Sequence, residues 1–213
     1  VKPVFDRRVF LKTCTNGSSE LMTNLSMSLV NALYNLQLMK IAGENGVAAY
    51  GAVMYVNFIF VATFLGYAIG CAPVISYHYG AGNHAELKNL YKKSMSIILV
   101  WGVILFGAAQ LLAPVLSKIF VGYNTGLYAM TLHGFRVYAI AFLIIGINIF
   151  GSSFFTALNN GLISAVISFL RTLVFQVIMV LTLPLWFGIN GIWSAISIAE
   201  ALTLIMTTTF FAV

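Results

Sequence analysis

The sequence predicts an all-α membrane protein with six transmembrane helices. Of its 213 residues, 61% are hydrophobic and only 8% are charged, and the mean hydropathy is +0.97. A soluble domain has about 25% charged residues, so this composition cannot cover a water-exposed surface. Four stretches without any charge are each longer than the ~20 residues that a helix needs to cross a bilayer. They lie between Glu44 and Glu86, Lys93 and Lys118, Arg136 and Arg171, and Arg171 and Glu200.

Apolar runs between helix breakers define the individual helices. They predict spans at 18–41, 47–78, 94–120, 131–157, 162–185 and 190–213. We interpret the long second run as a single helix that bends near Pro73. The segments AGENG, GYNTG and WFGING are predicted turns on one side of the membrane, and NHAELKNLYKK is a predicted loop on the other. Residues 1–17 are then a linker, and residues 18–213 form one six-helix unit.

Lysine and arginine residues predict the orientation of these spans. Cytoplasmic loops carry an excess of basic residues, and here seven lie on one side against three on the other. The seven are Lys2, Arg7, Arg8, Lys12, Lys88, Lys92 and Lys93. We therefore expect a multi-pass protein of the cell membrane with both termini in the cytoplasm. Because the basic residues flank apolar spans, the net charge of +6 does not indicate a nucleic-acid partner.

Polar residues recur at helical spacing on three of the spans, so that each set occupies one face of its helix. Such faces avoid lipid and contact either other helices or a watery cavity. Serine and threonine commonly form hydrogen bonds between helices, and that alternative stays open beside the cavity. The candidate cavity-lining residues are Asn24, Ser28, Asn31, Asn35, Asn148, Ser152, Thr156, Ser168 and the aromatic Phe175. The GxxxG pair Gly66 and Gly70 favours close helix packing.

Two charged residues lie deep within neighbouring spans. Arg171 is about 14 Å from one end of the fifth span, and Glu200 is about 15 Å from the opposite end of the sixth, at 1.5 Å per residue. Both depths reach the middle of a ~30 Å hydrocarbon core. An unpaired charge there costs at least a few kcal/mol, so we expect an ion pair. This pair either fixes helix packing or takes part in ion coupling.

Glu20 lies near the predicted start of the first span and has two interpretations. Asn16 or Ser18 is a possible N-cap, and an acidic residue in the first turn suits the helix dipole. Glu20 also shares a face with Asn24 and other polar residues, which favours a functional role. The spacing leaves the two interpretations equal.

The sequence does not indicate an enzyme. It contains no HExxH motif and no Ser/His/Asp set at workable spacing. Cys14 and Cys71 are isolated, which predicts neither a metal site nor a disulfide framework. We expect no cofactor.

Several stretches together resemble the multidrug and toxic compound extrusion (MATE) family of antiporters, and more narrowly its bacterial multidrug-efflux branch. They cover essentially the whole chain in register: GSSELMTNLSMSLVNALYN, GVAAYG, GCAPVISYHYGAGNHAELK, GFRVYAIAFLIIGINIFGSSFFTALNNG, SFLRTLVF and FGINGIW. Members of the family have twelve helices in two six-helix lobes. The resemblance implies that this chain is the C-terminal lobe and that its partner is the missing N-terminal lobe.

The resemblance also implies a function for Glu20. The family carries a functional glutamate in GSSELMTN-like sequence, and Glu20 occupies that place. It implies coupling of H⁺ or Na⁺ to the export of cationic amphipathic drugs. Sodium-coupled members carry a second acid on the fourth helix of the lobe, and this sequence has none there. Tyr34, Phe154 and Phe175 are candidates for stacking against a cationic drug. Alternatives are a flippase for lipid-linked saccharides and a membrane scaffold that transports nothing.

Overall fold

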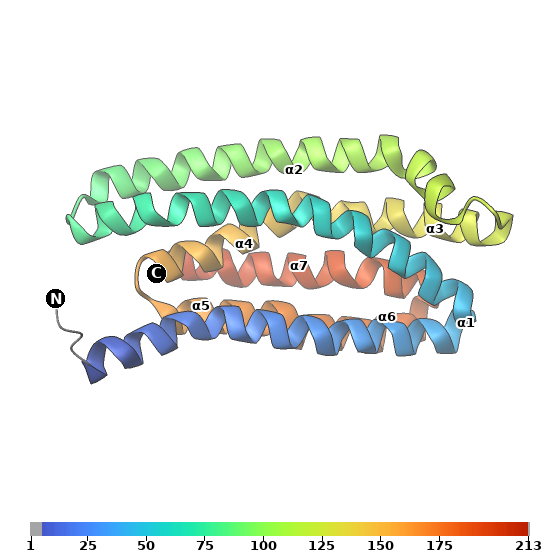
Figure 1. Cartoon of the computed structure of the whole chain (residues 1–213), viewed down its shortest axis with the longest axis horizontal. Coiled ribbons are helices and arrows are strands. Elements are labelled where there is room, and N and C mark those ends of the chain that lie inside the picture. The colour runs from blue at the N-terminus through green and yellow to red at the C-terminus, as the bar shows by residue number, and fades with distance from the viewer. Residues whose placement is uncertain (1–5, 213) are drawn as a thin grey trace.

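The computed structural model describes residues 6–212, with the side chains of 15, 16, 18–20, 22 and 212 excepted. The described backbone is helical apart from short turns. Its helices run lengthwise in an elongated bundle, with the N-terminal segment, the C-terminal helix end and the turn before α2 at one end (Figure 1). The elements are α1 (Arg7–Gly80), α2 (His84–Val121), α3 (Thr125–Tyr138), η1 (Ala139–Ala141), α4 (Phe142–Ala157), α5 (Gly161–Phe169), η2 (Leu170–Phe175), α6 (Gln176–Phe187) and α7 (Ile189–Ala212).

Gly43 divides α1 into two antiparallel arms. Its φ of +63° and ψ of −154° lie in a region that is essentially restricted to glycine. The first arm therefore turns back without an intervening loop (Figure 1). The side chains confirm the pairing of the arms, since the Tyr50 hydroxyl donates to Asn31 Oδ1 at 2.9 Å.

Five stretches of described helix are long and apolar enough to cross a membrane. One of them, Thr23–Gly80, contains both arms of α1, so the described helices are sufficient for the six predicted spans. The others are His84–Val121, Thr125–Ala157, Gly161–Phe187 and Ile189–Phe211. The predicted turns AGENG, GYNTG and WFGING are confirmed. AGENG contains the positive-φ Gly43, GYNTG joins α2 to α3, and WFGING contains the positive-φ Gly188.

Two boundaries differ from the prediction. The helix of the first span begins at Arg7 rather than at residue 18, because Asp6 is its N-cap and accepts hydrogen bonds from the amides of Arg8 and Val9. Likewise, the predicted loop NHAELKNLYKK is the start of α2. Asn83 caps this helix by accepting from the Glu86 amide, and an acidic residue in the first turn suits the helix dipole.

The span formed by α3, η1 and α4 is the centre of the bundle. It is the most buried of the five stretches, and α4 packs against α1, α2, α5 and α7. Glycines permit close approach here: a Cβ on Gly134 of α3 would lie 2.7 Å from two ring carbons of Trp193 on α7. By contrast, nothing lies within 4 Å of a Cβ built on Gly66 or Gly70. The expectation that this GxxxG pair packs closely is wrong within the described residues.

Candidate functional site

A cavity of about 360 Å³ lies between the two arms of α1 and the spans that contain Tyr138, Arg171 and Glu200. For a space among apolar helices, its walls are unusually polar. The polar side chains that line it are Thr23, Asn24, Asn31, Tyr34, Tyr50, Asn57, Tyr138, Arg171, Thr172, Gln176 and Glu200. Of these, Asn24, Asn31, Arg171 and Glu200 were predicted site residues, and Tyr34 was a predicted stacking residue.

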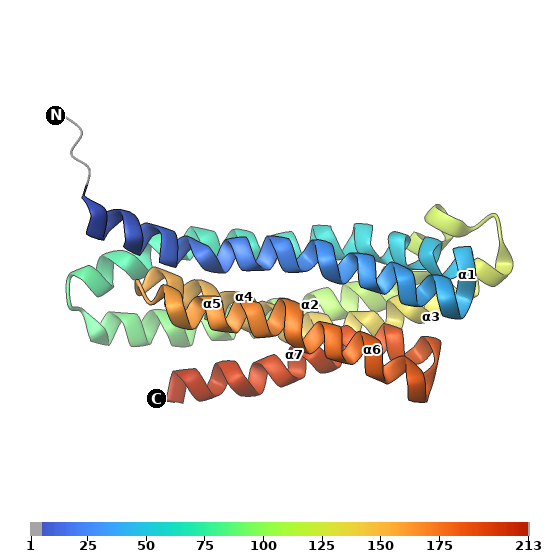
Figure 2. The same ribbon diagram turned by 90° about the horizontal axis from the view of Figure 1, so that it is seen from below.

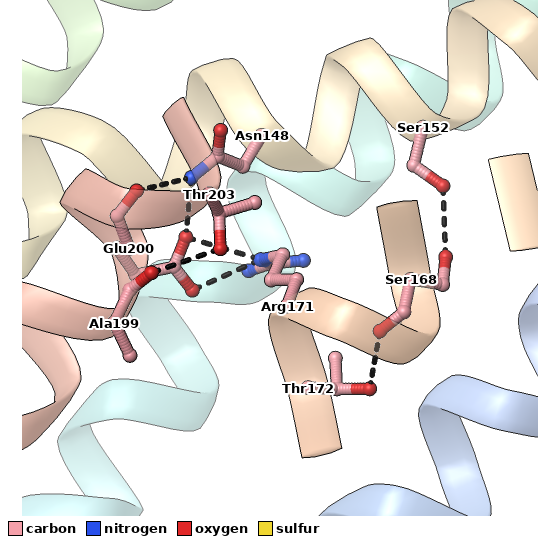
Figure 3. Close-up of polar contacts among 8 residues, drawn as sticks. All are labelled: Asn148, Ser152, Ser168, Arg171, Thr172, Ala199, Glu200 and Thr203. Atoms are coloured by element: carbon pink, nitrogen blue, oxygen red, sulfur yellow. Dashed lines mark hydrogen bonds and ion pairs between the residues drawn. The ribbon is translucent and has the colours of Figure 1, made fainter. Parts of the chain in front are cut away.

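The predicted ion pair is present. Arg171 Nε donates to Glu200 Oε1 at 2.9 Å and to Oε2 at 3.1 Å. Glu200 is 1% exposed and Arg171 is 14% exposed, so the two charges meet in the interior. Figure 3 shows the two side chains pointing toward each other from different spans.

Asn148 completes the surroundings of the carboxylate. Its Nδ2 donates to Glu200 Oε2 at 2.7 Å and to the Glu200 carbonyl oxygen at 2.9 Å (Figure 3). Polar residues from the predicted fourth and fifth spans, Asn148 and Arg171, therefore converge on the buried acid of the sixth. Asn148 is fully buried and does not line the cavity. Its second polar atom, Oδ1, has no hydrogen-bond partner among the described atoms.

Arg171 lies in a π-helical turn, η2. Such turns are rare, appear mostly as single turns within α-helices and are frequent at functional sites. The next residue, Thr172, donates its hydroxyl to the Ser168 carbonyl at 2.6 Å and lines the cavity. The wide turn therefore contributes two consecutive side chains to the cavity wall.

The cavity wall formed by α1 is aromatic and polar. The rings of Tyr34 and Tyr50 stack with their centroids 5.0 Å apart and an interplanar angle of 8°. Two cavity-lining oxygens, Tyr34 Oη and Asn57 Oδ1, are buried without a hydrogen-bond partner in the described structure. Burying such groups costs free energy unless something satisfies them. Both oxygens could therefore form a hydrogen bond with a polar group in the cavity.

The predicted Ser/Thr positions serve a different purpose in this structure. Ser152 and Thr156 of α4 form hydroxyl bonds to Ser164 of α5 at 2.9 and 2.6 Å, and Ser152 also bonds to Ser168 at 2.9 Å. None of these residues lines the cavity. The alternative of hydrogen bonds between helices therefore describes Ser152, Thr156 and Ser168.

The remaining candidates are distributed over the surface and the ends of the bundle. Ser28 and Asn35 are exposed on α1, and Phe175 is half-buried outside the cavity lining. Phe154 packs in an aromatic cluster with Tyr91 and Phe211. A place for these residues in a cavity between two lobes stays a prediction. Among the described side chains, no three metal-binding residues lie together.

The side chain of Glu20 lies outside the described residues, but its position along the helix is informative. The backbone of α1 is helical from Arg7, so Asn16 and Ser18 lie ten and twelve residues after the N-cap Asp6. The interpretation of Glu20 as a first-turn acid is therefore wrong. Glu20 precedes the cavity-lining residues Thr23 and Asn24 by about one helical turn.

Sequence reasoning missed six polar residues of the cavity wall: Thr23, Tyr50, Asn57, Tyr138, Thr172 and Gln176. Asn57 had a detectable signal, because it is the one amide side chain in an apolar run from Val47 to Leu65. The tyrosines had none, since aromatic residues are common in membrane helices and most of them only pack.

The family model for MatE matches residues 21–182. The chain belongs to the MatE family. No curated protein matches this MatE chain in sequence. Among solved structures, a MATE in the straight conformation superposes with a TM-score of 0.90 at 20% identity, over 97% of this chain and 46% of that one. An outward-facing multidrug resistance MATE family transporter of the MOP superfamily gives 0.88 at 22% identity, over 97% and 46%.

A MOP superfamily transporter from Pyrococcus furiosus is similar to the same degree, with a TM-score of 0.88 at 22% identity, over 97% of this chain and 47% of that chain. These likenesses show the fold. The MatE chain spans about half the length of these transporters and has the six-helix architecture of one of their lobes. Figure 2, turned by 90° from Figure 1, shows the same lengthwise arrangement from a second side.

Proposed function

We propose that this chain is the C-terminal half of a secondary active multidrug efflux antiporter of the cell membrane. It exports cationic amphipathic compounds in exchange for H⁺ or Na⁺ by alternating access between two lobes. The observation that carries the proposal is the polar cavity between membrane-spanning helices, with a buried carboxylate and unpartnered oxygens in its wall. A scaffold that transports nothing has no need for such a space, because ionisable groups within a membrane are expensive.

Glu20 is the group that exchanges the coupling ion in this proposal. Its place along α1, about one helical turn before the cavity-lining residues Thr23 and Asn24, supports this assignment. The carboxylate binds the coupling ion in one state and releases it when the drug is bound. Ion binding and drug binding therefore compete. Because Glu20 is far from the helix start, its conservative replacement by glutamine removes the charge without disturbing an N-cap.

Glu200 and Arg171 contribute to coupling through their ion pair. Both side chains line the cavity, so a cation that reaches Glu200 competes directly with the Arg171 guanidinium for the carboxylate oxygens. Neutralising Glu200 with a proton would release Arg171 toward the cavity. Because Arg171 lies in η2 and Glu200 in α7, breaking the pair when an ion binds would change how these two helices are held together.

The flippase alternative finds no support in the cavity. Among the described lining residues Arg171 is the only cation, and its Nε is engaged by Glu200. A pyrophosphate group would require several uncommitted cations, because phosphate recognition depends on charge-assisted bonds from Arg or Lys. The drug-export reading requires only acceptors and aromatic faces, and the cavity has both.

The test uses the full-length transporter with Glu20→Gln and, as a matched control, Glu44→Gln. Glu44 also belongs to α1, but it is exposed beside the Gly43 turn. At equal membrane expression, we expect Glu20→Gln to lose gradient-driven efflux of a cationic dye while Glu44→Gln retains it. Imposed H⁺ and Na⁺ gradients, applied separately, identify the coupling ion. Wild-type efflux from Glu20→Gln would overturn the assignment.

A further inference from the structure

A second hollow, which we call the basic groove, lies at the end of the bundle that holds the turn before α2. It has a volume of about 520 Å³ and is bounded by the start of α2 and the ends of α4 and α7. Its floor is aromatic. The Tyr91 ring centroid is 5.6 Å from that of Phe154 and 4.7 Å from that of Phe211, and the two phenylalanines are 5.7 Å apart.

The residues of the basic groove have the pattern expected at a membrane–water boundary. Phe154 and Phe211 are in the last turns of α4 and α7, which end at Ala157 and Ala212. The other wall is the polar first part of α2, which precedes the apolar part of that helix. The aromatic floor corresponds to the acyl-chain region of a leaflet, and the polar wall corresponds to its headgroup region.

Two lysines define the polar wall. Lys88 and Lys92 are exposed, line the groove and are four residues apart, so they lie on the same face about 6 Å apart along the axis. Within the described part of the chain, no carboxylate pairs with either lysine. The nearest acid in sequence, Glu86, accepts from Asn89 Nδ2 instead.

We propose that the basic groove binds an anionic phospholipid from the adjoining leaflet. The phosphate lies between the Lys88 and Lys92 ammonium groups, and an acyl chain covers the floor of Tyr91, Phe154 and Phe211. Lysine binds phosphate as a compact point charge with three donors. The aromatic floor decides for a lipid over a free phosphate ion, which would leave that surface uncovered. The site is separate from the cavity at Glu200 and does not depend on which ion drives transport.

The ligand would hold three separate helices together, because the groove walls come from α2, α4 and α7. Binding of a molecule to the folded state raises the apparent stability of that state. The proposal can therefore be tested by unfolding measurements that do not involve transport.

The test compares thermal unfolding of the full-length transporter in nanodiscs of neutral phosphatidylcholine and in nanodiscs that also contain phosphatidylglycerol. The variants are Lys88→Gln/Lys92→Gln and, as matched control, Lys93→Gln, which removes one exposed charge at the same depth outside the groove lining. We expect phosphatidylglycerol to raise the Tm of the wild type and of Lys93→Gln, and not that of the double variant. Apparent lipid affinity should fall about fivefold for each groove lysine removed. Inorganic phosphate should raise none of the Tm values.

A photoreactive phosphatidylglycerol analogue supplies an independent measurement, with the label expected on peptides that contain Tyr91 or Phe211. Three results would overturn the proposal. They are equal stabilisation of wild type and double variant, equal loss of stabilisation in the Lys93→Gln control, and absence of label from both peptides. The last result would mean that protein, from the second lobe or from chain beyond Val213, covers the groove.

Discussion

Arg171 and Glu200 form a two-point ion pair in which one nitrogen, Nε, contacts both carboxylate oxygens at 2.9 and 3.1 Å. The two residues come from different spans, and both side chains are largely buried. Replacing one residue of the pair leaves the other as an unpaired buried charge, whereas replacing both leaves no unpaired charge. Single and double replacements at these positions therefore have different consequences.

We expect Arg171→Met alone to lower the free energy of unfolding by about 3–5 kcal/mol. The double variant Arg171→Met/Glu200→Leu should recover most of that loss, because it replaces both charges with apolar side chains. Denaturant unfolding in bicelles measures both values. A double variant as unstable as the single one would contradict this account. Efflux of a stable double variant then separates the two roles: loss of efflux indicates coupling, and retention indicates packing only.

Asn57 and Asn148 are both buried amides, but their replacement should have opposite effects. Asn148→Leu removes donors to Glu200 and should cost about 1–3 kcal/mol, since a buried acceptor loses its partner. Asn57→Leu removes an oxygen that has no partner among the described atoms and should leave stability unchanged or slightly raised. It should nevertheless lower dye efflux, because it removes a polar atom from the cavity wall. Parallel unfolding and efflux assays check this, and normal efflux with Asn57→Leu would count against the cavity.

Gly134→Ala should destabilise the bundle, because the added methyl meets the ring of the buried Trp193. Overpacking of this kind costs about 1–3 kcal/mol. Gly66→Ala is the matched control, since open space surrounds its Cβ and alanine favours a helix by about 0.5–1 kcal/mol over glycine. Thermal unfolding of the two variants should give shifts of opposite sign. A large loss from Gly66→Ala would instead indicate that this face is covered in the complete transporter.

The orientation can be checked with single cysteines in a background without Cys14 and Cys71. Tyr123 is 82% exposed between α2 and α3, and His84 is exposed at the opposite end of α2. From the distribution of basic residues, we expect an impermeant thiol reagent added to intact cells to label Tyr123→Cys and not His84→Cys. The reverse labelling pattern would invert the topology.

The sequence was sufficient for the number of passes, because charge-free stretches and glycine-rich turns are local signals. It was not sufficient for two helix starts. Asp6 caps α1 twelve residues before the predicted start of the apolar run. The polar stretch after Asn83 resembles a loop in composition, although it is the first part of α2. In both cases a capping side chain extended the helix beyond the apolar segment that hydropathy detects.

Of the site, the sequence predicted contacts only where the depth of a charged residue in the membrane limited its possible partners. Arg171 and Glu200 had matched depths on consecutive spans, and a charge at that depth has few alternatives to pairing. The hydroxyl residues were different, because spacing shows that Ser152 and Thr156 share a face but not which helix that face contacts. They contact α5 rather than the cavity. Asn57 was missed because a lone amide has no periodicity.

The π turn η2 has a further consequence for the span that runs from Gly161 to Phe187. In a π turn each backbone hydrogen bond joins residues five apart instead of four, which widens the turn. The side chains after the turn are therefore rotated about the helix axis relative to their positions in a continuous α-helix. The part before the turn packs mainly on α1 and α4, and the part after it packs mainly on α7. A single helical wheel drawn through the span therefore assigns some side chains to the wrong neighbour. Sequence comparisons within the family should therefore assign helix faces separately before and after η2, which contains Arg171.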